Sequence, residues 1–417
     1  MELIKSRIFG YFVAAMRKKN KWSIESLAHS TNYSYSMIRS IEKGVSNLDE
    51  EDKNRFARLF GFSSFQSNIN NHYDWDMQLN ALENAQITLQ KEKQNQILHS
   101  ILENRSLIAS FLFPQYILMM FYDRITNDGN EHEINELQHW IEQMTDFYSP
   151  KEKALFFDLL GIYATDLEKE TAFFHTAYTY DPRSFLVNLH LAMNTYFHHR
   201  MMEASHYLEY CKSSLFQIGS IYRYIEISLL DAQLHIDLGN IDRAINTLIN
   251  LLTNQDQMDL YLRRSCLSLL AFGYFRKNDI RRAMDVAFAA IDLGEAKPLL
   301  YVIILFAAFR LDDPRFDLFV IRAKDHLYDV QSFESTNSFD LLVPWNQIID
   351  GIIAWKNRKF EMTIQCFEST LEPFAVDPLR PWILDCLVEC ARSSQNFELA
   401  LYYQKEISSL LQNNSTL

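Results

Sequence analysis

Small residues recur in register along the C-terminal two thirds of the chain. Each unit has a helix with a small residue midway, a short polar turn, and a second helix with a small residue near its start. The first-helix positions are Ala192, Ala232, Ala271, Gly351 and, as a departure, Val388; the second-helix positions are Ala204, Ala244, Ala283, Thr363 and Ala400. Since small side chains let two helices cross closely, the register predicts stacked helix pairs.

Successive second-helix positions lie 40, 39, 80 and 37 residues apart. The gap of 80 holds one degenerate unit with Ala307 and Phe319 in the two positions, and Gly161 and Ala172 mark a further unit upstream. This register resembles tetratricopeptide repeats (TPR), whose usual period is about 34 residues, although these units are longer. The resemblance implies a TPR-like, right-handed helical solenoid over residues 151–417.

Composition extends the helical prediction to the whole chain. Its 417 residues include only 10 glycines and 9 prolines, and residues 1–113 contain no proline. Helices tolerate such a composition better than sheets joined by tight turns, so we expect an all-α protein. Residues 65–150 are helical but show no repeat register, which predicts a linker bundle between an N-terminal domain (1–64) and the solenoid (151–417).

The sequence gives no sign of a membrane span, a metal site or catalysis. The two longest apolar stretches are each about 12 residues, too short to cross a bilayer, and no signal peptide begins the chain. The five cysteines are scattered without a CxxC pair, as in reduced cytosolic proteins. We therefore expect a cytoplasmic protein that is not an enzyme, uses no cofactor and does not bind membranes.

The first sixty residues carry the most specific motif. Apolar positions predict helices over 8–19, from 24 to the turn at 31, over 36–43 and over 51–60. Ser23 and Ser34 are suited to cap the second and third helices, and Gly44 supplies the left-handed residue after the third. The residues from Trp22 to Gly44 thus form two short helices around a turn at 31–33, which is a helix-turn-helix.

Charge separates this segment from the rest of the chain. Residues 1–60 hold eleven Lys and Arg against seven Asp and Glu, a net charge of +4. Since the whole chain has a net charge of −13, residues 61–417 carry −17. A basic N-terminus on an acidic body is expected when only the N-terminus meets nucleic acid.

The segment 22–44 resembles the Cro and phage-repressor (XRE) family throughout. The landmarks that carry the resemblance are Leu27-Ala28, Ser34, Ile38, Ile41-Glu42 and Gly44. Arg17 and Glu42 fall where that family places a buried, structural ion pair. The sequence departs from the family at Asn32, which replaces a turn glycine but tolerates the left-handed conformation. It also departs at Ile24, which replaces a phosphate-contacting glutamine.

The third helix would enter the major groove of double-stranded operator DNA. The resemblance places Tyr35, Ser36, Met37 and Arg39 towards the bases, with Ser34 as the cap and with Ser40 and Lys43 nearer the phosphates. The alternative is that these residues are only the solvated face of a small helix.

A TPR-like concavity would hold a short linear peptide. Repeat positions place polar groups among apolar ones on this face, which suits the unpaired backbone of an extended peptide. The candidate contacts are Asn194, Glu226, Leu229, Gln233, Asp237, Ser268, Phe272 and Arg276. The alternative for each is packing within the superhelix.

An XRE helix-turn-helix on a TPR-like array resembles the RRNPP family of peptide-sensing regulators of Gram-positive bacteria and their phages. The segments 1–5, 80–85 and 239–242 look most like phage arbitrium receptors. The resemblance implies a transcription regulator, of the quorum-sensing or lysis–lysogeny type, whose operator binding is controlled by a peptide. Arbitrium receptors tend to offer Arg and Asn where this chain has Glu226 and Gln233, which implies a different peptide with a basic residue.

Two further points concern partners. Helix-turn-helix proteins usually bind paired half-sites, and the last predicted helix, residues 397–411, is apolar for the end of a solenoid, so we expect a homodimer. The competing interpretation is a Rap-like scaffold that binds and inhibits a signalling protein without DNA. The complete helix-turn-helix favours the DNA-binding regulator, because the scaffold class lacks that motif.

Overall fold

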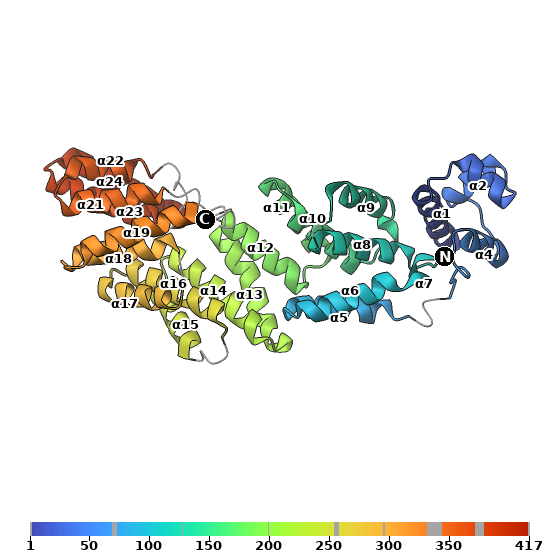
Figure 1. The fold of residues 1–417 in the computed structure, drawn as a ribbon, viewed down its shortest axis with the longest axis horizontal. Helices are drawn as coiled ribbons and strands as arrows, with labels where there is room; N and C mark the ends of the chain where they lie inside the picture. The colour runs from blue at the N-terminus through green and yellow to red at the C-terminus, as the bar shows by residue number, and fades with distance from the viewer. Residues whose placement is uncertain are drawn as a thin grey trace. The chain divides into compact units, whose positions relative to one another are not determined.

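The structure is a computed structural model that describes residues 2–68, 73–127, 129–198, 200–253, 258–294, 297–331, 344–371 and 379–415. These residues are almost entirely helical and contain no β-strand. The chain divides into two compact units, Met1–Asn194 and Thr195–Leu417. Figure 1 shows both units as successive helices from blue to red. The all-α prediction is confirmed.

The N-terminal head, residues 2–68, forms as its local signals predict. Its helices are α1 Glu2–Lys19, α2 Ile24–Thr31, α3 Tyr35–Glu42 and α4 Glu50–Leu59. Ser23 and Ser34 cap α2 and α3 by accepting hydrogen bonds from backbone N–H groups. Asn32 ends α2 in the left-handed region at φ 58°, and Gly44 follows α3 at φ 69°. The first turn of α1, before Ile8, was not predicted.

A bundle of helices, residues 73–148, follows the head, and three helices complete the first unit. The bundle comprises α5 Trp75–Ile87, α6 Lys91–Glu103, α7 Arg105–Ile108, α8 Phe113–Thr126, α9 Glu131–Gln143 and the 3₁₀ helix η2 Thr145–Phe147. Then come α10 Pro150–Tyr163, α11 Leu167–Tyr180 and α12 Phe185–Phe197, whose last residues belong to the second unit.

One continuous apolar core joins the head to the bundle. It runs from α1 to α10 without a break. Phe12 lies at the junction, fully buried, with ring centroids of Phe65 and Phe113 at 5.5 and 5.9 Å. The backbone N–H of Gln66 also donates to the carbonyl of Ala109 at 2.7 Å. Whether residues 1–64 and 65–150 fold as separate domains stays a prediction, because a shared core does not itself define folding units.

The second unit consists of stacked helix pairs. Its helices are α13 Met201–Ile218, α14 Ile221–Asp237, α15 Ile241–Thr253, α16 Leu260–Arg276, α17 Ile280–Asp292, α18 Pro298–Arg310, α19 Phe316–Gln331, α21 Trp345–Lys356, α22 Phe360–Glu368, α23 Arg380–Ser393 and α24 Phe397–Ser415. The first helices of successive pairs, α14, α16, α18 and α21, lie against one another. This arrangement is that of a helical-repeat solenoid.

The predicted register is confirmed by burial. Every first- and second-helix position named from 192 to 400 is buried. At Gly351 a Cβ atom would come within 2.8 Å of the Phe367 ring, so the close approach requires glycine. The upstream unit is also present, as the α10–α11 pair, but Ala172 is exposed and was wrongly assigned. Gly161 instead packs against Phe174, where a Cβ would lie 2.4 Å from the ring.

Candidate DNA and peptide interfaces

Helix α3 presents a polar face. Ser34, Tyr35, Ser36, Arg39 and Lys43 are exposed. The guanidinium of Arg39 lies 5.3 Å from the centre of the Tyr35 ring, so the two side chains form one cation–π pair on this face. Ile38 and Ile41, on the opposite side, are fully buried in the head core. The helix therefore offers hydrogen-bond donors and a cation to solvent while its apolar side fixes it in the head.

Two predicted DNA contacts are less accessible. Met37 and Ser40 are partly buried. The sulfur of Met37 accepts a hydrogen bond from Ser46 Oγ at 3.7 Å, which holds it towards the segment after α3. That segment also exposes Val45, at 68% of its surface, which sequence reasoning missed because a lone valine after a glycine carries no motif.

Arg17 and Glu42 form a bidentate ion pair between α1 and the end of α3. Nε of Arg17 lies 2.6 Å from Oε1 of Glu42, and Nη2 lies 3.1 Å from Oε2. Nη1 donates to the carbonyl of Trp22 at 3.0 Å, so the guanidinium also reaches the segment before α2. Both side chains are 13% exposed. The hydrogen bonds to Glu42 raise the pKa of Arg17 above its ordinary value.

A glycine that sequence reasoning did not single out brings α1 and α3 together. At Gly10 an added Cβ would lie 2.4 Å from the carbonyl oxygen of Ile41 and 2.9 Å from that of Glu42. Because both neighbours are backbone atoms, no side-chain rotation could relieve the clash. An isolated glycine in a helical pattern gives only a weak hint of such a contact.

In the second unit, helix α14 gathers polar side chains from the predicted peptide set. Tyr196 Oη donates to Oδ2 of Asp237 at 2.7 Å, and Gln233 Nε2 lies 3.2 Å from the same oxygen. Glu226, 48% exposed, pairs with the buried guanidinium of Arg223 at 2.5 Å. Leu229 is partly buried against the core of this unit. These groups are preorganised and reachable from solvent.

The predicted contacts on α16 differ from those on α14. Ser268 and Phe272 are 7% and 4% exposed, and Ser268 Oγ has no partner among the described residues. Arg276 is partly buried, 5.9 Å from the Phe272 ring centre. Burial raises the pKa of the Asp385 carboxyl, and the nearby positive charge of Arg276 partly opposes that rise.

An aromatic cluster joins α16 to helices α18 and α23. Trp382 of α23 lies with its ring 5.1 Å from both Phe275 of α16 and Phe306 of α18. Arg310 pairs with Glu389 at 2.7 Å, which also joins α18 to α23. Helix α23 therefore packs against α16 and α18 through these side chains.

Asn194 ends the first unit, on α12. It is 1% exposed, and its Oδ1 accepts a hydrogen bond from Thr171 Oγ1 at 2.9 Å. Its Nδ2 is buried and has no hydrogen-bond partner among the described residues. A buried amide donor without an acceptor costs free energy.

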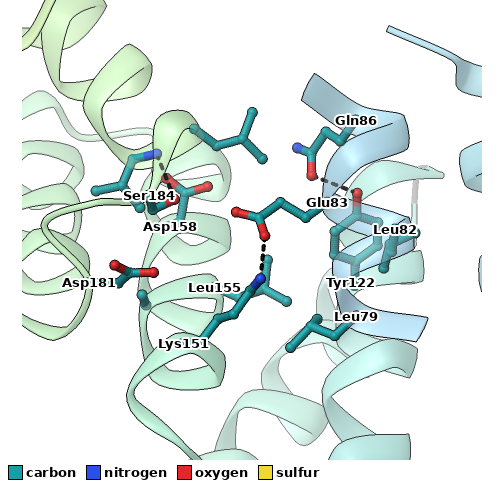
Figure 2. A pocket seen from close by; sticks show the side chains of 13 residues that line it. Leu79, Leu82, Glu83, Gln86, Tyr122, Lys151, Leu155, Asp158, Asp181 and Ser184 are labelled. Atoms are coloured by element: carbon teal, nitrogen blue, oxygen red, sulfur yellow. Dashed lines mark hydrogen bonds and ion pairs between the residues drawn. The ribbon is translucent and has the colours of Figure 1, made fainter. Parts of the chain in front are cut away.

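A small pocket of about 30 Å³ lies apart from these residues, within the first unit. Figure 2 shows Lys151 reaching to Glu83 and the hydroxyl of Tyr122 bonded to Gln86. Lys151 also donates to Asn80 Oδ1 at 2.5 Å, so these contacts fasten α5 to α10. None of the predicted site residues lines this pocket, and we interpret it as part of the packing of the first unit.

No described helix combines the length and apolar character needed to cross a membrane. The sequence matches no protein-family model, and no curated protein matches it.

Solved structures do match the fold. The apo quorum sensor NprR from B. thuringiensis gives a TM-score of 0.60 at 13% identity, over 81% of this chain and 97% of that one. A Rap protein complexed with competence and sporulation factor gives 0.53 at 14%, over 82% and 97%. NprR in complex with its cognate peptide NprX gives 0.53 at 14%, over 82% and 99%. The chain therefore has the helical-repeat fold of the Rap and NprR proteins, as its resemblance to the RRNPP family implies.

Proposed function

We propose that this chain is a bacterial or phage-encoded cytoplasmic transcription regulator of the RRNPP family, whose binding to operator DNA is controlled by a short peptide. The observation that carries the proposal is the exposed polar face of α3 on a chain with the Rap and NprR fold. The basic head and acidic remainder support DNA binding by the head alone. Its role would be non-enzymatic, in quorum sensing or in the choice between lysis and lysogeny.

Replacing Tyr35 and Arg39 by alanine should weaken specific DNA binding. Each lost base contact should cost about 1–3 kcal/mol of binding free energy. Lys43→Ala should instead weaken binding to all DNA sequences alike and reduce the salt dependence of that binding. The measurement is binding to DNA selected by the full-length chain from a random-sequence pool, at several salt concentrations. Unchanged sequence preference in the double variant would contradict the assignment of α3.

The same experiment distinguishes the DNA-binding regulator from a second candidate function, a protein-binding scaffold. The similarity to a Rap protein favours a scaffold that acts on a signalling partner without DNA. Failure of the full-length chain to enrich any DNA sequence from the pool, with and without peptide, would support the scaffold instead.

The peptide site is proposed on α12 and α14. Asp237, already held by Tyr196 and Gln233, offers a fixed carboxylate to a basic peptide residue. Glu226 adds a second carboxylate, although Arg223 offsets its charge. NprR, which shares the fold, has been solved with its cognate peptide bound.

Asp237→Asn should weaken binding of a peptide with a basic residue by about 10- to 150-fold, since a hydrogen bond to a charged group contributes about 1.5–3 kcal/mol. Glu226→Gln should add a smaller loss. Calorimetry with synthetic peptides of five to ten residues that carry one Lys or Arg gives the affinities. Asp317→Asn, exposed on α19, is the matched control. Equal affinities for Asp237→Asn and the control would rule out this acidic site.

A homodimer is proposed because two heads are needed for two half-sites. Helix α24 exposes Phe397, Leu401 and Tyr402 at 70, 53 and 56%, a surface that a second copy would cover. Leu410 and Leu411, also predicted there, lie outside the residues whose side chains are described. Leu401→Glu should turn a dimer into a monomer in light scattering; a variant that stays dimeric would exclude α24 as the interface.

A further inference from the structure

Helix α1 carries two different faces. Ile8, Phe9, Phe12, Val13 and Met16 are buried in the head core. A second face carries Arg7, Tyr11 and Lys18, spaced by four and seven residues, so they project from one side of the helix. None of these three would be expected in a core from sequence.

This second face is joined to the end of the bundle. Both terminal nitrogens of Arg7 lie 3.2 Å from Oδ2 of Asp146, and Tyr11 Oη donates to the carbonyl of Gln143 at 2.9 Å. Lys18 Nζ lies 4.6 Å from the centre of the Trp140 ring. The Tyr11 ring meets those of Trp140 and Phe147 edge-on, at 6.4 and 5.9 Å. We call this set of contacts, α1 residues 7, 11 and 18 with residues 140–147, the seam.

A neighbouring face of α1, about a quarter turn around the helix from the seam, holds α3. Gly10 brings the backbone of α1 against the carbonyls of Ile41 and Glu42, and Arg17 closes the bidentate pair with Glu42. Helix α1 is therefore fixed to α3 by one face and to α9 and η2 by a neighbouring face. The bundle is in turn fastened to α10, where Trp75 Nε1 donates to the buried carboxylate of Glu152 at 2.7 Å.

We infer that the seam sets the direction in which α3 faces DNA, so that Tyr11, Lys18 and Trp140 are positioning residues for operator recognition without touching DNA. The inference rests on the proposed DNA-binding function and deepens it. A head on a flexible tether could bind half-sites at many separations. A head fixed to the rest of the first unit can engage two half-sites only at the spacing that the dimer sets. Because the head is fixed, a conformational change elsewhere in the protein can alter that spacing and so alter DNA binding.

The test is the tolerance of the full-length protein to operator spacing. DNA selected by the wild-type chain from a random pool is compared with a derivative whose half-sites are moved apart by about 5 base pairs, half a helical turn. We expect the wild type to lose about 10- to 100-fold in affinity, because the DNA must deform to satisfy both heads. The Tyr11→Ala/Lys18→Ala variant keeps the core at Phe12 but loses two contacts of the seam. Its loss should be at least about threefold smaller than that of the wild type, while it binds a single half-site normally.

The variant spares the head core, and Lys19→Ala/Lys21→Ala, on exposed lysines nearby, controls for lost positive charge. An equal spacing penalty in wild type and seam variant would overturn the inference. Loss of single half-site binding in the seam variant alone would also overturn it, since these residues would then bind DNA or fold the head.

A second measurement needs no DNA. A fluorophore on Asn47→Cys in the head, with Cys366→Ser to remove the partly exposed thiol, should tumble with the whole protein in wild type. It should become more mobile in the seam variant, although the core at Phe12 still joins the head to the bundle. Fast head motion in the wild type would overturn the inference. If instead the wild-type head is rigid but the protein selects no DNA, the result counts against the proposed function and not against the seam.

Discussion

Replacing Glu42 by alanine is expected to destabilise the head by about 3–5 kcal/mol, because Arg17 would be left as a largely buried cation without its bidentate partner. The loss should be local, since the pair joins α1 to the end of α3. Hydrogen exchange of the α1 and α3 amides in the full-length protein reports the free energy of that local opening.

Two further variants distinguish the effect of losing the Glu42 charge from the effect of losing the volume of its side chain. Glu42→Gln keeps the size of the side chain and one acceptor, so it should lose less than Glu42→Ala. Arg17→Met/Glu42→Leu removes both charges, and replacing a buried pair by apolar groups is often neutral or stabilising. If Glu42→Ala leaves exchange unchanged but lowers DNA affinity, the glutamate acts at the DNA interface and the structural role is wrong.

Local features of the head could be predicted because their causes lie within a few residues. Ser34 caps α3 through a hydrogen bond to Met37 N–H, three residues on. Asn32 takes the left-handed conformation for which its side chain is suited. The pairing of Arg17 with Glu42 needed more than spacing, and the prediction came from the resemblance to the XRE family.

The accessibility of the peptide candidates could not be predicted in the same way. Repeat positions identify which side of α16 faces the other first helices, but not what covers that side. Trp382 of α23 lies more than a hundred residues beyond Phe275, and its position depends on the rise and rotation accumulated over the intervening pairs. Ser268 and Phe272 were therefore expected to be exposed and are buried.

The seam was missed for a related reason. Tyr11 and Lys18 lie on what reads as the polar face of an amphipathic helix, and such a face is normally solvated. Long side chains can bury their stems and rings while their polar ends are satisfied at the surface. That is how Tyr11 reaches the carbonyl of Gln143 and Lys18 reaches the Trp140 ring.

The other large effect is expected at Phe12, where the cores of the head and the bundle meet. Its side chain is fully buried, and its ring lies within 5.9 Å of the rings of five others: Phe9, Phe60, Phe62, Phe65 and Phe113. Phe12→Ala should lower stability by about 3–5 kcal/mol through lost burial and the cavity it leaves. Tyr261→Ala, at a side chain 72% exposed, is the matched control and should change stability by less than about 0.5 kcal/mol.

The pattern of the loss matters as much as its size. If the head and bundle share one core, Phe12→Ala should raise hydrogen exchange in α1 and α8 together, because Phe12 packs on Phe113 at the start of α8. Exchange that rises in the head alone would mean that the two cores open separately, and the head could then move independently of the bundle. Since a typical domain is stable by only about 5–15 kcal/mol, the variant should remain folded enough for this comparison at low temperature.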